Sequence, residues 1–420
     1  MASSARSIWT LIGVETMCFL GSEISRYGIA VWIFDVTGSV TAFSLLLAAN
    51  VVPGMLARPI AGSIVDRSSR KLVMIGASVV SLCGTMIVLG GALLGELSMP
   101  LVLAGASLAS VGEAFQWPAL SATIPLMASE EDLPRYNGFL ESGRAAGRFA
   151  GPPIGAFFFG TVGVTGLVSI ELATFTLAAI VVSLLQLPQP DEEPPEAESL
   201  VDELSFGTRW IWAHKPLFKF MLVATFANFL LGIGEVVMQP YGLGALGRDG
   251  FGIASGLFGA GMIVGGIVTG ALSRRLTSTQ QFLWSALFVG ALYVTYGLSR
   301  DVVALGAMNF AIATMMTIGN ASIMTIWQTK VPAELQGRVL SAMMMAVDIT
   351  TPLAFLAGAP AAVAIAHWLF GHSNAASVWG GSETGELGGL FSALGALQFV
   401  LFTAVAFMRD IRRVEDLAVE

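Results

Sequence analysis

Long apolar stretches alternate with short polar or charged turns along almost the whole chain. A helix that crosses a bilayer needs about 20 mostly apolar residues, and each of these stretches is long enough. Division of the sequence at its charged and glycine- or proline-rich positions predicts twelve such helices. Their expected ranges are 8–34, 39–65, 72–95, 99–127, 136–160, 164–187, 216–244, 250–273, 280–298, 302–328, 338–370 and 388–408. The stretch 338–370 is the longest, and we expect it to kink at Pro352 or Pro360.

One long polar interruption, residues 188–215, separates the first six predicted spans from the last six. The expected fold is therefore an all-α membrane protein of two six-helix bundles, residues 1–187 and 216–420, joined by a cytoplasmic linker. The second part of the linker, from Leu200 to Trp212, mixes apolar and charged residues with tryptophans, as helices on a membrane surface do. A solvated linker without such a helix is the alternative.

Basic residues predict the orientation of the spans. With Met1 in the cytoplasm, fifteen of the 21 Lys and Arg residues fall on the inner side, against only Arg248 and Arg300 on the outer side. Lys and Arg near the ends of spans resist translocation, so this asymmetry predicts that both termini are cytoplasmic. The first span is interrupted by charged residues and does not have the pattern of a cleaved signal peptide.

The composition excludes a soluble domain of this size. The chain is 55% hydrophobic and 12% charged, and its mean hydropathy is +0.76. The net charge of −8 arises largely from acidic residues in the linker and gives no sign of a nucleic-acid partner. Cys18 and Cys83 lie within predicted spans as small apolar residues, and no metal site or cofactor is expected. The sequence lacks His-Glu-x-x-His, Gly-x-Ser-x-Gly and Walker-type motifs, which disfavours an intramembrane enzyme and an ATP-driven pump.

A short basic turn lies between the second and third predicted spans. It reads Gly62-Ser63-Ile64-Val65-Asp66-Arg67-Ser68-Ser69-Arg70-Lys71, with the spacing Gly-x-x-x-Asp-Arg-x-x-Arg-Lys. A weaker copy without the acidic residue runs from Gly266 to Arg275, which indicates two repeated halves, as in secondary transporters. With this motif and its six-plus-six pattern, the chain resembles the major facilitator superfamily over nearly its whole length. The resemblance implies alternating access and a gating latch formed by Gly62, Asp66, Arg67, Arg70 and Lys71; a simple positive-inside turn is the alternative.

A row of glycines follows in the fifth predicted span. Four of them recur every fourth residue from Gly143 to Gly155, and the run resembles the antiporter motif Gly-x-x-x-Gly-Pro-x-x-Gly of exporters through Gly147, Gly151, Pro152 and Gly155. Such a row gives a smooth face for a neighbouring helix, and close packing alone is the alternative. A looser resemblance, to the macrolide-efflux and enterobactin-exporter branch, is carried by the runs Gly21–Gly28, Thr37–Ser39 and Gly207–Pro216. Many drug exporters have an arginine in span four; this chain has Glu113 there, so that relay is not transferred.

Ionisable side chains inside the predicted spans are concentrated in the first half. Each costs about 2.5 to 3.5 kcal/mol near the bilayer centre, so each is expected to face a partner or water. The candidates for proton coupling are Glu113 first, then Glu23 and Glu141, with Arg26, Arg144 and Arg148 as their partners and Glu235 and Asp348 in the second half. Static ion pairs that fix helix register are the alternative for each of them, and Glu171 is interpreted as an anchor of a bundle contact.

The expected function is proton-coupled export of a hydrophobic or amphipathic small molecule, either a drug or a secreted metabolite such as a siderophore. The partners are then the lipid bilayer of the bacterial inner membrane, the substrate and protons, and the chain is expected to work as a monomer. An uptake symporter or a lipid flippase on the same fold is the first alternative, and a non-transporting sensor or an intramembrane enzyme is the second. By their positions in the spans, the residues expected to line the substrate cavity are Tyr27, Trp32, Asn50, Gln116, Trp117, Asn228, Gln239 and Asn309.

Overall fold

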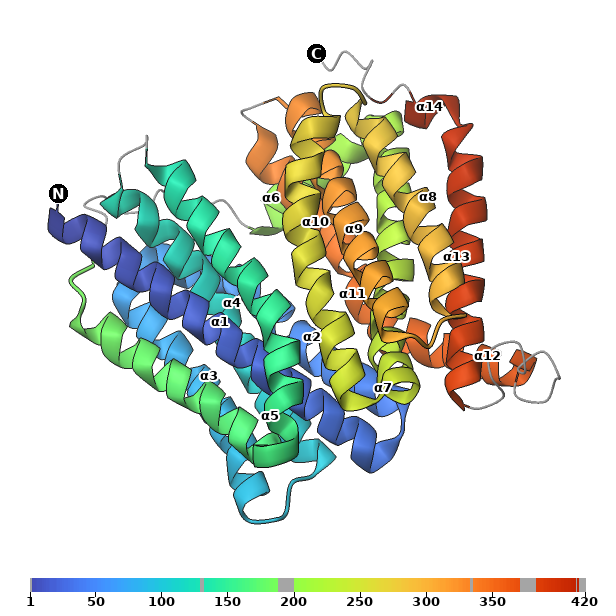
Figure 1. The fold of residues 1–420 in the computed structure, drawn as a ribbon. Helices are drawn as coiled ribbons and strands as arrows, with labels where there is room; N and C mark the ends of the chain where they lie inside the picture. The colour runs from blue at the N-terminus through green and yellow to red at the C-terminus, as the bar shows by residue number, and fades with distance from the viewer. Residues whose placement is uncertain are drawn as a thin grey trace. The chain divides into compact units, whose positions relative to one another are not determined.

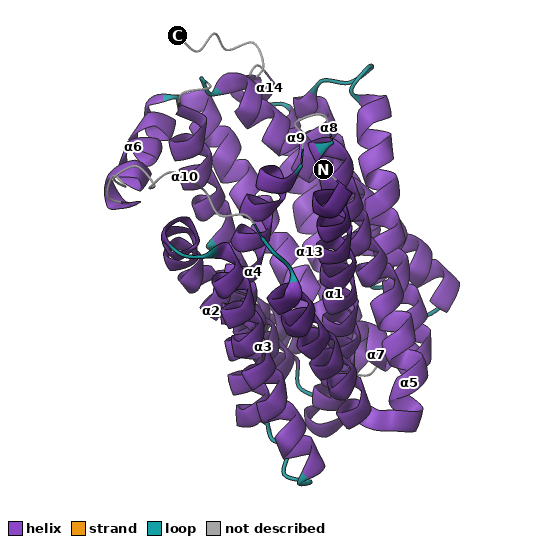
Figure 2. Cartoon of the chain, turned by 90° about the vertical axis from the view of Figure 1, so that its left-hand side faces the viewer, coloured by secondary structure: helices purple, strands orange, loops and turns teal. Residues whose placement is uncertain are grey.

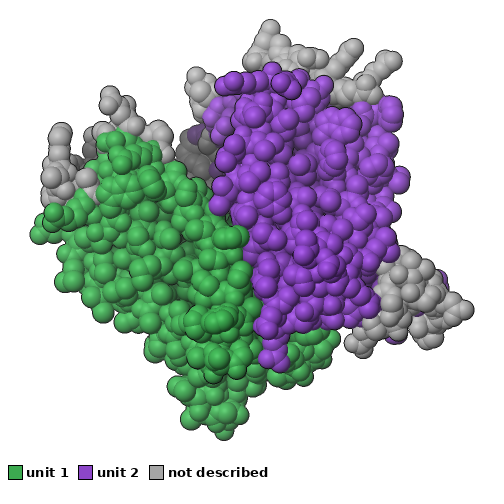
Figure 3. All heavy atoms as spheres, in the orientation of Figure 1, with its two compact units in different colours: residues 1–197 green, residues 198–420 purple. Residues whose placement is uncertain are grey.

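The computed structural model describes residues 2–128, 132–187, 200–332, 335–370, 383–412 and 414. Within these residues the regular structure is helical and contains no strand (Figure 2). The chain divides into two compact units, residues 1–197 and 198–420 (Figure 3). The boundary falls within residues 188–215, the segment that the sequence analysis assigns to a linker.

The first unit consists of five helices in chain order (Figure 1). They are α1 (Ala2–Thr37), α2 (Val40–Arg67), α3 (Arg70–Leu93), α4 (Met99–Met127) and α5 (Leu133–Leu184). Serines begin two of them: the side chain of Ser39 accepts a hydrogen bond from the N–H of Ala42, and Ser69 accepts one from Leu72. A serine oxygen in this position satisfies an N–H group that has no partner within the helix.

Helix α5 is two helical segments joined at Gly163, whose φ of 61° and ψ of −171° are not helical. Glycine suits this position because a side chain would be strained there. Figure 1 shows the chain turning back on itself after the first segment. The predicted break between spans five and six, at residues 160–164, coincides with this turn.

Helix α1 lies between the two segments of α5. The close pairs with the first segment are Thr16 with Gly143, Phe19 with Gly147, Glu23 with Gly151 and Tyr27 with Gly155. Both numbers rise together, so this segment runs parallel to α1. The close pairs with the second segment are Gly21 with Thr174 and Gly28 with Leu167, and here the order is reversed. The second segment is therefore antiparallel to α1.

Two apolar clusters fill the two ends of the first unit. One contains Leu11, Met74 and Leu120, and the other contains Ile33, Phe43 and Val102, each with further side chains from the five helices. Both clusters consist of fully buried aliphatic and aromatic side chains, with some half-buried ones around them. The middle of α1 lies between these clusters and carries Glu15, Glu23 and Arg26.

The second unit is built from helices of very different lengths. It contains α6 (Leu200–Ala213), α7 (Lys215–Leu272), α8 (Ser278–Tyr296), α9 (Val302–Lys330), α10 (Gln336–Asp348), α11 (Thr350–Leu353), the π-helical turn η2 (Ala354–Gly358), α12 (Ala359–Phe370), α13 (Glu383–Ala406) and α14 (Arg409–Arg412). Gly247 interrupts α7 with a φ of 69° and a ψ of −178°, as Gly163 interrupts α5. The turn η2 lies between Pro352 and Pro360, where the sequence predicts a kink.

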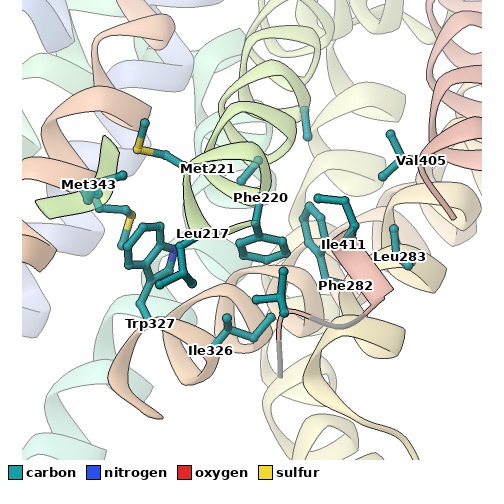
Figure 4. Close-up of a cluster of buried hydrophobic side chains, with 14 of the residues drawn as sticks. Leu217, Phe220, Met221, Phe282, Leu283, Ile326, Trp327, Met343, Val405 and Ile411 are labelled. Atoms are coloured by element: carbon teal, nitrogen blue, oxygen red, sulfur yellow. The ribbon is translucent and has the colours of Figure 1, made fainter. Parts of the chain in front are cut away.

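A large apolar cluster holds the second unit together (Figure 4). Phe220 of α7 lies edge to face with Phe282 of α8, with 5.1 Å between the ring centroids. Trp327 of α9 and Ile411 of α14 complete the cluster, and both are fully buried. Helices from α6 to α14 therefore share one core.

Within the described residues, seven helices are long and apolar enough to cross a membrane. They are Val40–Arg58, Arg70–Leu93, Gly138–Leu184, Lys215–Leu272, Val302–Lys330, Arg338–Phe370 and Thr384–Ala406. Two of them have 47 and 58 residues and contain the interruptions at Gly163 and Gly247. About 20 residues suffice for one crossing, so each of these two is long enough for two. The total of twelve spans stays a prediction.

Candidate functional site

Charged and polar side chains form a layer in the middle of the first unit, between its two apolar clusters. Arg26 of α1 is the centre of this charged layer. Its Nη2 donates a hydrogen bond to Glu113 Oε1 of α4 at 2.5 Å, and its Nη1 donates to Glu23 Oε1 at 3.3 Å. One guanidinium therefore holds two carboxylates from two helices, which its fork of N–H groups is suited to do.

A third carboxylate, Glu171 on the second segment of α5, lies close to this pair. It is only 8% exposed. Its polar neighbours are Ser22 and Ser25 of α1, with the charges of Arg26 and Glu113 next. Arg26, Glu113 and Glu171 also line one common cavity. Three helices thus bring three carboxylates to one arginine.

A second polar group lies beside the first along α1 and α4. The amide Nε2 of Gln116 donates a hydrogen bond to the carboxylate of Glu15. Arg144 of α5 lies over the ring of Trp117, with 4.2 Å between its Cζ and the ring centroid. Its Nη1 lies 3.7 Å from Oε1 of Glu141. A guanidinium over an indole is attracted by the electrons of the ring face, so Trp117 holds Arg144 without neutralising its charge.

Two cavities open into the charged layer. One, of about 30 Å³, is lined by Arg26, Glu113 and Glu171, and the other, of about 100 Å³, by Glu15, Glu113 and residues around them. Glu113 lines both. The first has room for about two water molecules and the second for several, because a cavity needs about 10 to 15 Å³ for each water. Drug-sized ligands need about 300 Å³ or more, so neither cavity holds one. Glu113 therefore has space for water on two sides.

The sequence was compared with known families and proteins. A sequence model of the Major Facilitator Superfamily matches residues 11–355. The chain belongs to the major facilitator superfamily. It is 22% identical over 373 residues to macrolide efflux protein A of Streptococcus pyogenes, a match that covers 86% of this chain and 91% of that protein. It is also 25% identical over 362 residues to the multidrug efflux pump Tap of Mycobacterium tuberculosis (strain CDC 1551 / Oshkosh), which covers 82% of this chain and 84% of the pump.

Solved transporter structures share the fold of this superfamily member. An inward-facing bacterial homologue of the human lysosomal transporter Spinster superposes with a TM-score of 0.72 at 14% identity, over 98% of this chain and 97% of that one. The nucleoside transporter NupG superposes with a TM-score of 0.72 at 12% identity, over 96% and 100% of the two chains. The chain is therefore a multi-pass membrane transporter and not an enzyme.

The structure brings together some of the proton-coupling candidates of this transporter and separates others. Glu113, Glu23, Arg26 and Arg144 all belong to the charged layer or its cavities. Glu141 lies at its edge and is exposed, and so is Arg148, whose Cζ is 5.8 Å from the ring centroid of Phe19. Glu235 and Asp348 are exposed residues of the second unit. Among the described residues, no group of three or more His, Cys, Asp and Glu side chains is placed to hold a metal ion.

Sequence reasoning left Glu15 and Glu171 out of the candidate set. Both are ionisable residues within predicted spans, but no spacing along the chain connects Glu171 to Arg26 or Glu113. The helical register of α1 is the sequence feature that places Glu15 on the same face as Arg26. Glu15, Ser22 and Arg26 are spaced i, i+7 and i+11, so they lie along one helix face.

The residues expected to line a substrate cavity have several different surroundings. Asn50, Gln116 and Trp117 line the two cavities of the charged layer. Tyr27 is buried against Gly155, and Trp32 packs on the apolar cluster around Phe43. In the second unit, Asn309 is fully buried and donates to the carbonyl of Ala254, Asn228 donates to Val347, Thr350 and Thr351, and Gln239 is half-buried. Asn309 and Asn228 thus connect helices: α9 to α7, and α7 to the break between α10 and α11.

The two superfamily motifs are described to different extents. The backbone of Gly62, Asp66 and Arg67 is part of α2. The side chains of Asp66 and Arg67 and the surroundings of Gly62 lie outside what the structure describes. Arg70 begins α3, and Lys71 Nζ donates to the carbonyl of Leu185 at 2.8 Å, directly after the last residue of α5. A lysine there is favourable because the carbonyl groups at a helix end are unsatisfied and carry partial negative charge.

The antiporter motif forms the contact between α5 and α1. Gly147, Gly151 and Gly155 are buried and face Phe19, Glu23 and Tyr27, while Pro152 is half-buried. A Cβ on Gly151 would lie 2.5 Å from the Cβ of Glu23, closer than two such atoms approach. The glycine is therefore needed for the position of Glu23 beside Arg26.

Replacement of Gly151 by alanine tests this contact. The added methyl group displaces Glu23 and α1, and overpacking of this kind costs about 1 to 3 kcal/mol. We expect transport to fall about tenfold, since 1.4 kcal/mol corresponds to a factor of ten. Gly160→Ala is the matched control, because a Cβ on Gly160, in the same segment, has no neighbour within 4 Å. Equal transport rates for the two variants would show that the close approach at Gly151 is unimportant.

Proposed function

We propose that this transporter exports hydrophobic or amphipathic small molecules in exchange for protons. It is proposed to do so by alternating access, with twelve spans, both termini in the cytoplasm and the protein in the bacterial inner membrane. The observation that carries the proposal is the ion pair between Arg26 and Glu113 at the junction of two small cavities. A carboxylate that is paired inside an apolar bundle and also open to water is suited to bind and release a proton.

Export is proposed because the sequence relatives named above are efflux proteins for macrolides and for multiple drugs. Both matches extend over more than four fifths of this chain. The fold alone is compatible with uptake, since a D-xylose-proton symporter superposes with a TM-score of 0.66 at 13% identity. The proposed cargo is therefore a macrolide-like or other amphipathic compound, and a secreted metabolite such as a siderophore is the second possibility.

In the proposed cycle, the carboxyl group of Glu113 forms and breaks its ion pair with Arg26. When Glu113 is ionised, it holds Arg26 and links α4 to α1. When a proton binds to Glu113, the charge attraction is lost and the link between the two helices weakens. The proton and the conformation of the bundle are then coupled, because each changes the stability of the other.

Substitution of Glu113 by glutamine tests the proposal. Gln keeps the shape of the side chain but cannot be ionised, so coupling should be lost while the fold is kept. In inside-out vesicles with an acidic lumen, we expect accumulation of a radiolabelled macrolide to fall at least ~100-fold, which corresponds to about 2.7 kcal/mol. The wild-type protein should alkalinise the lumen when the macrolide is added, in sodium-free buffer.

The matched control is Glu96→Gln, which removes an exposed carboxylate between α3 and α4. Its transport rate should stay within about twofold of the wild type, as surface substitutions usually do. Full activity of the Glu113→Gln protein, or wild-type transport of the macrolide without proton movement, would contradict the proposed mechanism.

A further inference from the structure

Among the described residues, Glu171 is the only acidic or basic side chain that is buried, and the mechanism proposed above does not use it. It lies on the face of α5 that packs on α1, between the contacts of Leu167 with Gly28 and of Thr174 with Gly21. A helix anchor would not need a carboxyl group at this position, since a carboxylate is costly to bury.

The charges around Glu171 do not balance if all of them are ionised. Arg26 contacts Glu113 at 2.5 Å and Glu23 at 3.3 Å, whereas no ion pair of the described residues includes Glu171. Three carboxylates and one guanidinium would leave two negative charges between the two apolar clusters. Removal of such charges from water costs several kcal/mol per ion, so a proton on one carboxyl group is favoured.

The surroundings of Glu171 accommodate both forms of the acid. The hydroxyl groups of Ser22 and Ser25 lie beside it, and Arg26 is paired with Glu113 and Glu23 instead. The Oγ of Ser25 is buried and has no hydrogen-bond partner in the structure. A protonated carboxyl group can donate a hydrogen bond to this oxygen, and a carboxylate can accept one from the same hydroxyl group, as a residue that exchanges a proton requires.

From this geometry we propose that Glu171 is a second proton-binding residue, which exchanges Arg26 with Glu113 during transport. While Glu113 is ionised and holds Arg26, Glu171 keeps its proton. When a proton from the larger cavity binds to Glu113, Arg26 is released and pairs with Glu171, which gives its proton to water in the smaller cavity. One proton binds and one leaves, so the net charge of the layer is the same before and after. The inference rests on the proposed proton-coupled function.

The proposal requires that other titratable groups near Glu171 are taken into account. Those that face it or lie one turn away are Cys18, Glu23 and Arg26 on α1 and Glu113 on α4. Helix α3 also packs on α5, and beyond its first turn its only titratable side chain is Cys83. Glu15, on α1 near Cys18, is the remaining acidic residue of the layer.

Infrared spectroscopy of the full-length protein in lipid nanodiscs tests the protonation of Glu171 directly. The wild-type protein at neutral pH should show the carbonyl band of a protonated carboxylic acid, and the difference spectrum against Glu171→Gln should contain this band. The band should weaken or disappear in Glu113→Gln, because glutamine mimics protonated Glu113 and leaves Arg26 free to pair with ionised Glu171. Gln mimics the neutral acid, so we expect the melting temperature of Glu171→Gln to stay within about 2 °C of the wild type. A difference spectrum without the acid band would overturn the proposal.

Transport in proteoliposomes separates this inference from the proposed function. Glu171→Gln should exchange radiolabelled macrolide across the membrane without a gradient at close to the wild-type rate, but lose pH-driven accumulation about 20-fold or more. Glu171→Asp should recover part of the accumulation with a changed pH profile, and Ser169→Ala, on the exposed face of the same segment, should behave as the wild type.

Three outcomes have different meanings. Wild-type-like pumping by Glu171→Gln would overturn the role of Glu171 and leave Glu113 as the coupling residue. Equal loss of exchange and accumulation, with no recovery in Glu171→Asp, would assign Glu171 a purely structural role and also overturn the proposal. Absence of proton movement in the wild type would instead contradict the proposed function. The infrared experiment would still show independently whether Glu171 carries a proton.

Discussion

Replacement of Arg26 by alanine is expected to abolish coupled export and to reduce the amount of folded protein. Arg26 contacts both Glu23 and Glu113, so its loss removes the cation that these two carboxylates share. Removal of one partner from a half-buried charge pair costs about 1 to 3 kcal/mol. We expect pH-driven accumulation of a macrolide to fall at least ~100-fold. The measurement is accumulation in inside-out vesicles, normalised to folded protein from size-exclusion chromatography.

Three further variants make the Arg26 prediction specific. Arg6→Ala removes an exposed arginine from the same helix and should have little effect. Arg26→Lys should recover the folded protein but little of the transport, because one ammonium group cannot replace the fork of a guanidinium. Arg26→Ala combined with Glu113→Gln should be more stable than Arg26→Ala alone, because an unpaired charge has been removed. If the double variant were less stable than either single variant, the two residues would not form the pair described above.

The second large effect is expected from Gly84→Val, at the contact between α3 and α4. A Cβ on Gly84 would lie 2.5 Å from the carbonyl oxygen of Gly105 and 2.9 Å from the amide of Ala109, and both are backbone atoms that cannot turn aside. The two helices must therefore separate, which removes the packing on which association in a membrane depends. We expect the melting temperature of the purified protein to fall by about 5 to 10 °C, equivalent to roughly 3 kcal/mol.

Gly76→Val controls for the effect of valine on the helix itself. Gly76 is on the same helix, and a Cβ there has no neighbour within 4 Å. Both variants exchange the same residue types, so the intrinsic change in helix propensity is shared. The difference between them is then the cost of the close contact alone. Similar melting temperatures for the two variants would contradict the tight packing of α3 on α4.

The hydrophobic pattern predicts the positions of the helices well. The predicted range 99–127 is that of α4 (Met99–Met127), and 302–328 differs from α9 (Val302–Lys330) by two residues at one end. These helices are bounded by turns of polar residues, so their ends are visible in the sequence. The pattern does not show that α5 and α7 continue as helix on both sides of a single glycine, because the apolar period is the same before and after Gly163 and Gly247.

The site is less accessible to sequence reasoning than the fold. The cost of charge in a bilayer identifies Glu113 as a residue that needs a partner, and the spacing of Glu23 and Arg26 predicts their contact. The partner of Glu113 is 87 positions away, and its identity depends on how α1 packs between the two segments of α5. The same is true of Glu171. The stripe formed by Glu141, Arg144 and Arg148 suggests that these residues meet Glu113, but Arg144 contacts the ring of Trp117 and the carboxylate of Glu141 on its own helix instead.

The two cavities of the charged layer are large enough for water and protons but too small for the cargo. With about 30 and 100 Å³, they admit water and protons but no drug-sized molecule. The cargo must therefore bind at least in part outside these two cavities. Substitutions that alter which compounds are carried can then accumulate without disturbing the acidic side chains around Arg26. A lineage built on this unit could acquire new export substrates under antibiotic selection while its means of drawing on the proton gradient stayed constant.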